Sequence, residues 1–190
     1  MNKVILKAFF LILLLNHFSP LFAGFQSSVE IRSAAFFHSS ERFRKIYGNV
    51  GASYQIEAST RLCSCLDGWA NFDWFSRHGR SGGFCDPARA CIANVSFGIK
   101  APYQFCDQWI VYVGVGPSLS RIWLKNKSQC SHESVSKLAL GGVLKTGVNY
   151  CIFRNIFMDV FVDYLYQPVH FKTHVDIGGF KTGAGLGVKF

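Results

Sequence analysis

Beyond its first 23 residues, the 190-residue sequence has no apolar run approaching the roughly 20 residues that a transmembrane helix requires. Its apolar residues recur at every second position there, so the 3.6-residue period of an amphipathic helix is missing as well. Acidic residues are also few, 11 against 20 basic ones. If the protein lies in a membrane, it therefore crosses that membrane as β-strands.

The amino-terminal segment has the three parts of a secretory signal peptide. Lys3 and Lys7 form a basic region, residues 8–15 are apolar, and Ala23 supplies a small residue at which a signal peptidase cuts. The apolar part is too short to span a bilayer. An uncleaved helix is the alternative, but we predict a cleaved signal peptide over residues 1–23.

The remaining residues, 24–190, are enough for one domain and little more. Loss of the signal peptide takes away Lys3 and Lys7 and no acidic residue. It leaves 18 basic and 11 acidic residues and a formal charge of +7. We predict a single barrel domain over residues 24–190, for the following reasons.

From Gly24 onward, segments of about ten residues alternate between apolar and small or polar side chains, which is typical of membrane-barrel strands. The final segment, residues 180–190, is the clearest and ends the chain on Phe190. The pattern predicts an all-β fold, an eight-stranded antiparallel up-and-down transmembrane β-barrel. The seven earlier segments are residues 29–37, 50–59, 69–75, 93–103, 109–123, 137–150 and 156–166.

The polarity of the two strand faces distinguishes a membrane barrel from a soluble one. A soluble barrel such as a lipocalin has an apolar interior and a charged exterior. Here one face is nearly free of charge along seven strands, whereas the other carries glycine, serine, asparagine and ions. Water would not tolerate the first face uncovered, so we predict that it faces lipid.

The ions on the polar face are nearly balanced in sign. An eight-stranded barrel is wide enough only for its own side chains, so we predict a hydrogen-bonded plug and not an open channel. Charge pairs across an ordinary half-exposed sheet are the alternative. The predicted interior network consists of Glu30, Arg32, Glu57, Asp73, Lys100, Lys145, Asp159, Asp163, Lys181 and Lys189.

The lengths of the connections predict the topology. With both termini in the periplasm, long loops over residues 39–49, 76–92, 124–136 and 168–177 lie outside the cell. Short connections over residues 60–68, 104–108 and 152–155 then lie inside. Aromatic residues near the strand ends predict interfacial girdles: Tyr103, Trp109 and Tyr150 at the short connections, and Phe37, Tyr47, Trp123 and Tyr166 at the long ones.

The long loops are basic and contain few acids. Such a surface would pair with lipopolysaccharide phosphates or with anionic glycans of a host surface, and a solvated surface without a ligand is the alternative. No groove or stacking pattern predicts a nucleic-acid partner. The loop cations are Arg42, Arg44, Lys45, Arg77, His78, Arg80, Arg89, Lys125, Lys127 and Lys172.

Seven cysteines are divided between the two ends of the predicted barrel, and in an oxidising envelope all are disulfide candidates. Cys85 and Cys91 form the most plausible local bridge, and the odd total leaves at least one thiol free or joined to another chain. Zinc is the alternative at Cys63 and Cys65, but their spacing is unusual for zinc and no histidine is near, so we predict no metal or cofactor. The remaining candidates are Cys106, Cys130 and Cys151.

With these residues in view, the chain resembles the small eight-stranded outer-membrane barrels of Gram-negative bacteria, the OmpA/OmpX-like superfamily. The resemblance covers the mature chain and ends in the assembly signal of that family, here Phe180, Leu186, Val188 and Phe190, which implies recognition by the barrel-assembly machinery. The many cysteines differ from enterobacterial members. They look more like chlamydia-type envelopes, which implies disulfide cross-linking to other envelope proteins.

Residues 38–41 and 131–133 contain serine, histidine and glutamate, the residue types of a hydrolase triad. Neighbours in an extended chain point to opposite sides and do not converge, so we predict no enzyme. We predict a structural or surface-interaction barrel in the outer membrane that acts through its basic outer loops. A narrow, porin-like pore for small solutes is the alternative, followed by a lipid A-modifying enzyme.

Overall fold

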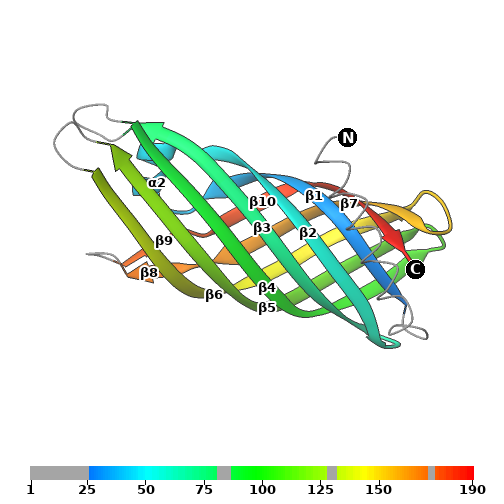
Figure 1. Ribbon diagram of the computed structural model, residues 1–190. Coiled ribbons are helices and arrows are strands. Elements are labelled where there is room, and N and C mark those ends of the chain that lie inside the picture. The colour runs from blue at the N-terminus through cyan, green and yellow to red at the C-terminus, as the bar shows by residue number, and fades with distance from the viewer. Residues whose placement is uncertain (1–25, 81–86, 128–131, 171–173) are drawn as a thin grey trace, which may run out of the picture.

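A computed structural model of the chain describes residues 26–80, 87–127, 132–170 and 174–190. The predicted signal peptide, residues 1–23, lies outside the described residues. Eight antiparallel strands close into a barrel in the order β1-β10-β7-β6-β5-β4-β3-β2 (Figure 1). The predicted fold class is confirmed.

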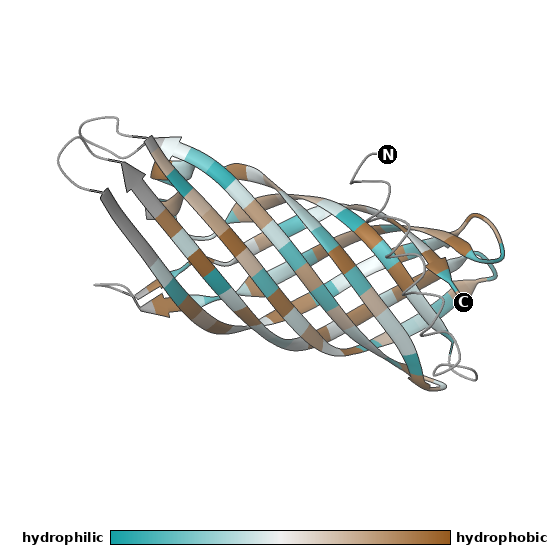
Figure 2. Cartoon of the chain, in the orientation of Figure 1, coloured by the Kyte–Doolittle hydropathy of each residue, from teal (hydrophilic) through white to brown (hydrophobic). Residues whose placement is uncertain are grey.

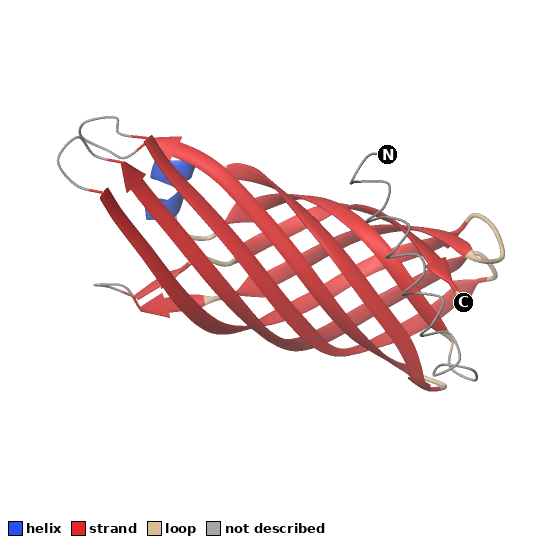
Figure 3. Ribbon diagram, in the orientation of Figure 1, coloured by secondary structure: helices blue, strands red, loops and turns tan. Residues whose placement is uncertain are grey.

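Strands make up nearly all of the described chain, with one short helix at one end of the barrel (Figure 3). In the part of the chain that the structure describes, no helix is long and apolar enough to cross a bilayer. The elements are β1 (Ser27–His38), α2 (Glu41–Tyr47), β2 (Val50–Cys63), β3 (Leu66–Arg80), β4 (Pro87–Cys106), β5 (Trp109–Lys127), β6 (His132–Cys151), β7 (Ile156–Tyr166), β8 (Pro168–His170), β9 (His174–Asp176) and β10 (Gly179–Lys189).

The first and last strands of the chain close the barrel. Their register runs from Ser28 opposite Lys189 to His38 opposite Gly179. At the end of this ladder, the backbone N–H of Phe190 donates to the carbonyl of Ser27 over 2.9 Å, and the reverse bond measures 3.0 Å. The barrel therefore has no free strand edge.

Side chains alternate between the two faces of the barrel wall, and Figure 2 shows apolar and polar residues alternating along the strands. Outward residues such as Ile31, Phe97 and Leu140 are large, apolar and more than half exposed. Inward residues such as Arg32 and Lys145 are buried. The exterior is the apolar face, as a barrel in lipid requires.

Two connections are shorter than predicted because the β3–β4 and β5–β6 ladders continue past the apolar region. Most of the predicted loops over residues 76–92 and 124–136 is paired strand, since backbone pairing does not depend on side-chain polarity. The other two predicted long loops contain structure of their own. Residues 39–49 hold α2, and residues 168–177 hold the β8–β9 hairpin.

We call this end of the barrel the long-loop end. At the opposite end, the short-turn end, the first strand begins at Ser27 and the last strand ends at Lys189. The three tight turns at residues 64–65, 107–108 and 152–155 lie there too (Figure 1). The predicted connections over residues 60–68 and 104–108 are thus shorter than expected, because β2, β3 and β4 extend into them.

An apolar cluster fills the barrel at the long-loop end. Phe36 and Phe75 meet edge to face there, with ring centroids 5.5 Å apart. Helix α2 packs Phe43 and Tyr47 into the same cluster, and burial raises the pKa of the Tyr47 phenol. The prediction that Tyr47 belongs to an interfacial girdle is wrong, because the helix turns this ring inward, whereas Tyr166 is 53% exposed.

The outward face predicts a depth-dependent penalty for charge. Leu144 lies midway along the apolar face of β6 and is half exposed. We expect Leu144→Arg to lower the free energy of unfolding in lipid vesicles by about 2–4 kcal/mol, because the guanidinium would lie near the bilayer midplane. Leu138→Arg, nearer the long-loop end, should cost only about 0–1 kcal/mol. Urea titration measures both, and equal small losses would contradict a lipid-facing exterior.

Candidate functional site

The centre of the barrel interior is occupied by an ion network around Arg32 of β1. Its guanidinium lies 2.6 Å from Glu30, 2.9 Å from Asp159 and 3.1 Å from Glu57, measured between nitrogen and carboxylate oxygen. Asp163 lies 3.9 Å away. All five side chains are almost completely buried. One cation therefore joins strands β1, β2 and β7 across the interior.

Glu57 of β2 is the main acceptor of this network. Besides Arg32, it accepts from Lys100 of β4 over 3.1 Å and from Lys145 of β6. Lys145 also lies 3.6 Å from Asp163. Because each lysine comes from a different strand, the cluster connects both sides of the barrel and fills the space between them.

Tyr112 of β5 completes the cluster. Its hydroxyl accepts a hydrogen bond from Arg32 over 2.9 Å and donates one to Asp159 over 3.1 Å. Gly147 on β6 lies opposite, and a Cβ there would approach this hydroxyl to 2.5 Å. The inward parity of Tyr112 was visible in the sequence. Its position in the network was not, because the alternation along a strand shows which residues point inward but not which of them lie at the same height in the barrel.

A second ion pair lies apart from the Arg32 cluster. Lys181 of β10 donates to Asp73 of β3, which also accepts from Ser53 of β2. The ammonium group of Lys181 also lies over the ring of Phe36, 4.8 Å from its centroid, and Phe36 belongs to the apolar cluster. This pair therefore lies between the ionic and the apolar parts of the interior.

Lys189 is separate from the other predicted network residues. It is the last residue of β10, and its ammonium group donates to the thiol of Cys151 over 3.4 Å. It lies at the mouth of the short-turn end because it pairs with Ser28 near the end of the β1–β10 ladder. Of the ten predicted residues, the structure thus brings nine into the central interior.

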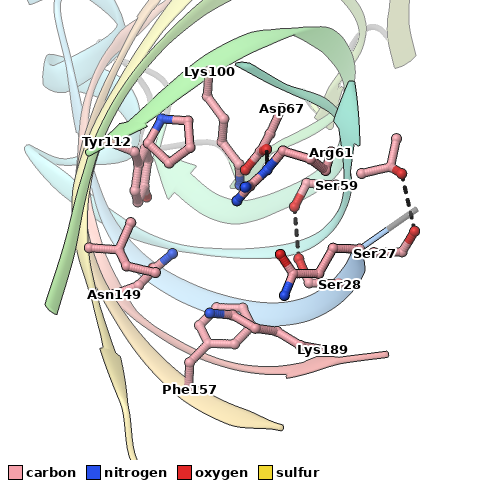
Figure 4. A pocket seen from close by; sticks show the side chains of 14 residues that line it. Ser27, Ser28, Ser59, Arg61, Asp67, Lys100, Tyr112, Asn149, Phe157 and Lys189 are labelled. Carbon is pink, nitrogen blue, oxygen red and sulfur yellow. Dashed lines mark hydrogen bonds and ion pairs between the residues drawn. The ribbon is translucent and has the colours of Figure 1, made fainter. Parts of the chain in front are cut away.

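A cavity of about 50 Å³ opens beneath the ion network at the short-turn end. Figure 4 shows Lys100, Tyr112, Asn149 and Lys189 around it, with one hydrogen bond between Ser28 and Ser59 at one side. The volume is enough for only a few water molecules. The interior is thus a filled, polar core that leaves a shallow vestibule at one mouth.

Three residues of the predicted assembly signal lie on the outer surface of β10, and Phe190 directly follows that strand. Phe180, Leu186, Val188 and Phe190 are each about half exposed, at 55, 59, 49 and 58%. They belong to the apolar exterior of the closing strand, which pairs with β1 on one side and β7 on the other.

The described cysteines carry free thiols: Cys63, Cys65, Cys91, Cys106 and Cys151. The predicted bridge from Cys91 to Cys85 stays a prediction, because residues 81–86 lie outside the described residues. Cys91 lies within β4 beside Ser76 of β3, with 3.4 Å between sulfur and hydroxyl oxygen. Cys85 and Cys130 lie outside the described residues.

Cations surround α2 at the long-loop end. Arg77 donates to the carbonyl of Tyr47 over 3.1 Å, and Arg44 donates to the carbonyl of His38 over 3.3 Å. A groove of about 570 Å³ lies between α2 and the end of β1, where Arg44 and Lys45 stand beside the outward ring of Phe37. Arg89 is exposed on β4. The side chains of Arg42, Arg80, Lys125, Lys127 and Lys172 lie outside the description.

In the cluster at residues 38–41, the serine next to the helix and the glutamate stabilise the first turn of α2. Ser40 is the N-cap of α2, and its hydroxyl accepts from the backbone N–H of Phe43 over 3.3 Å. Glu41 pairs with Lys45 one turn later, over 3.0 Å. Among the described residues, no group of three or more histidine, cysteine or acidic side chains is arranged to hold a metal ion.

We expect a large loss of stability when the buried Asp73–Lys181 pair is broken. We expect Asp73→Asn to lower the free energy of unfolding by about 3–5 kcal/mol, because Lys181 would remain buried without the carboxylate that it directly pairs with. The double variant Asp73→Leu/Lys181→Met should recover most of that loss, since a buried pair and its apolar replacement are often similar in stability. Urea titration in vesicles measures both, and a double variant as unstable as Asp73→Asn would contradict this account.

No known protein family and no curated protein sequence match the chain. Solved structures match its fold. Ail, the attachment invasion locus protein of Yersinia pestis, solved with the heparin analogue sucrose octasulfate, is 14% identical, with a TM-score of 0.60 over 87% of this chain and 99% of Ail.

Two further solved structures have a similar fold. Neisserial surface protein A is 20% identical, with a TM-score of 0.57 over 87% of this chain and 96% of its own. OprG, an outer-membrane protein of Pseudomonas aeruginosa, is 9% identical, with a TM-score of 0.58 over 87% and 94%. The chain therefore has the fold of the small eight-stranded outer-membrane β-barrels.

Proposed function

We propose that this protein is a structural and surface-interaction barrel of the bacterial outer membrane. The observation that carries the proposal is the pairing of an apolar exterior with an interior closed by the Arg32 network. Such a barrel anchors the chain in lipid without conducting solutes. Its function then lies at its two ends.

The short-turn end faces the periplasm in this proposal. Barrels of this class have short periplasmic turns and longer extracellular loops, and the same asymmetry separates the two ends of this chain. The exposed aromatic end of β10 at Phe190 suits recognition by the barrel-assembly machinery during insertion. A cleaved signal peptide over residues 1–23 would bring the chain to that machinery.

The long-loop end contacts anionic polysaccharide in this proposal. Arg44 and Lys45 line the groove at α2 together with Phe37 and with Glu41, which pairs with Lys45. Lipopolysaccharide phosphates and the sulfates of host glycans are anionic groups of the kind that such cations bind. Ail, which has the same fold, has been solved with a sulfated ligand.

A narrow conduit is the second candidate, and the polar vestibule at the short-turn end is the observation that favours it. Conductance separates the two functions. We expect negligible steady conductance of the wild-type barrel in planar bilayers. Lys145→Ala and Asp159→Ala should each raise it, because each removes a side chain that fills the interior. Lys189→Ala, at the mouth, is the control and should change nothing. Steady conductance of the wild type would favour the conduit.

The anionic-polysaccharide role predicts weak, salt-sensitive binding of sucrose octasulfate. We expect Lys45→Gln to weaken it about two- to fivefold, the effect of losing one exposed charge contact. Arg154→Gln, an exposed cation at the short-turn end, is the matched control and should bind as the wild type does. Calorimetry in detergent measures all three proteins. Equal losses for both variants, or binding that is insensitive to salt, would contradict a site at α2.

A further inference from the structure

The β2–β3 turn carries two thiols that neither the ion network nor the basic surface uses. Cys63 ends β2, Ser64 and Cys65 form the turn, and Leu66 begins β3. The ladder changes register between Arg61 and Cys63, as at a β-bulge, and Cys63 pairs with Leu66. The turn lies at the short-turn end, drawn in teal in Figure 1, and both thiols are exposed.

The two thiols are close and differ in their proton affinity. Their sulfur atoms lie 3.7 Å apart and share a hydrogen bond. The backbone N–H of Cys65 is the main cause that lowers the pKa of the Cys63 thiol, and the thiol of Cys65 and the charge of Arg61 act in the same direction. The hydrogen bond with Cys63 raises the pKa of Cys65. The two shifts therefore favour loss of the proton from Cys63 before Cys65, and the thiolate is the nucleophile of a cysteine.

We propose that Cys63 and Cys65 form a redox-active dithiol that exchanges with protein disulfides at the short-turn end. Cys63 is the attacking thiol and Cys65 is the resolving thiol. The proposal takes its class of partner, a disulfide-bearing periplasmic protein, from the orientation in the proposed function, whereas the exchange chemistry itself depends only on the turn.

The exchange proceeds in two steps. The Cys63 thiolate attacks one sulfur of the partner disulfide, forms a mixed disulfide with it, and releases the second partner sulfur as a thiolate that takes a proton. Cys65 then loses its proton and attacks the Cys63 sulfur. This forms the Cys63–Cys65 disulfide and releases the first partner sulfur, which is protonated in turn. Two electrons pass from the barrel to the partner, and the reverse sequence oxidises a partner dithiol.

The other described thiols at this end lack such an arrangement. Cys106 is exposed, but no described contact gives it a second thiol. Cys151 is half-buried, and its sulfur accepts from Lys189. Both provide matched controls, because they share the compartment and the scaffold but not the paired turn.

Oxidised glutathione is the probe that tests the proposal on the reduced, folded barrel in detergent. The reaction is quenched by alkylation, and mass spectrometry locates each modification. We expect the wild type to form the Cys63–Cys65 disulfide without retaining glutathione there. Cys65→Ser should retain glutathione on Cys63, because the resolving thiol is missing. Cys63→Ser should react at this turn several-fold more slowly, and Cys106→Ser and Cys151→Ser should form the turn disulfide as the wild type does.

Two results would overturn the proposal: glutathione retained on Cys63 in the wild type, or equal reaction rates at Cys63 and Cys106. Shifted unboiled bands on denaturing gels verify that each variant folds. Labelling of intact cells with a membrane-impermeant maleimide tests orientation separately. Labelling of Cys63 from outside would refute the periplasmic assignment while leaving the exchange chemistry standing.

Discussion

Closure of the backbone hydrogen-bond ladder is the constraint on which the rest of this structure depends. In hydrocarbon every N–H and C=O needs a partner within the protein, and strands meet that need only when the sheet has no edge. Here β10 pairs with β1 along its length, and Phe190 and Ser27 exchange the last two backbone bonds. Once the sheet is closed, each residue faces either lipid or the interior.

The interior then has to be filled by side chains, because eight strands enclose little space. Ions fill its middle and aromatic and aliphatic residues fill its long-loop end. Arg32 is central to the ionic part because a planar guanidinium offers donors in several directions and so serves carboxylates on different strands. Glycines such as Gly147 make room where a large ring crosses the interior.

The two ends of the barrel differ in the same way as the environments proposed for them. At the long-loop end, paired strands continue past the apolar exterior, and α2 packs Phe43 and Tyr47 over the interior as in a soluble domain. At the short-turn end the wall stops in tight turns that leave thiols exposed.

The sequence by itself determined the fold class and the face of each residue, because a period of two is a local property that needs only the alternation of side chains along a strand. It therefore predicted that Arg32, Glu57 and Asp159 point inward. Only the tertiary structure decided which inward residues meet, since that depends on the register between strands that are distant in sequence. Register brings Tyr112 into the network and leaves Lys189 at the mouth, and long-range packing turns Tyr47 inward. The paired thiols of the β2–β3 turn likewise depend on the register at which β2 and β3 meet before the turn.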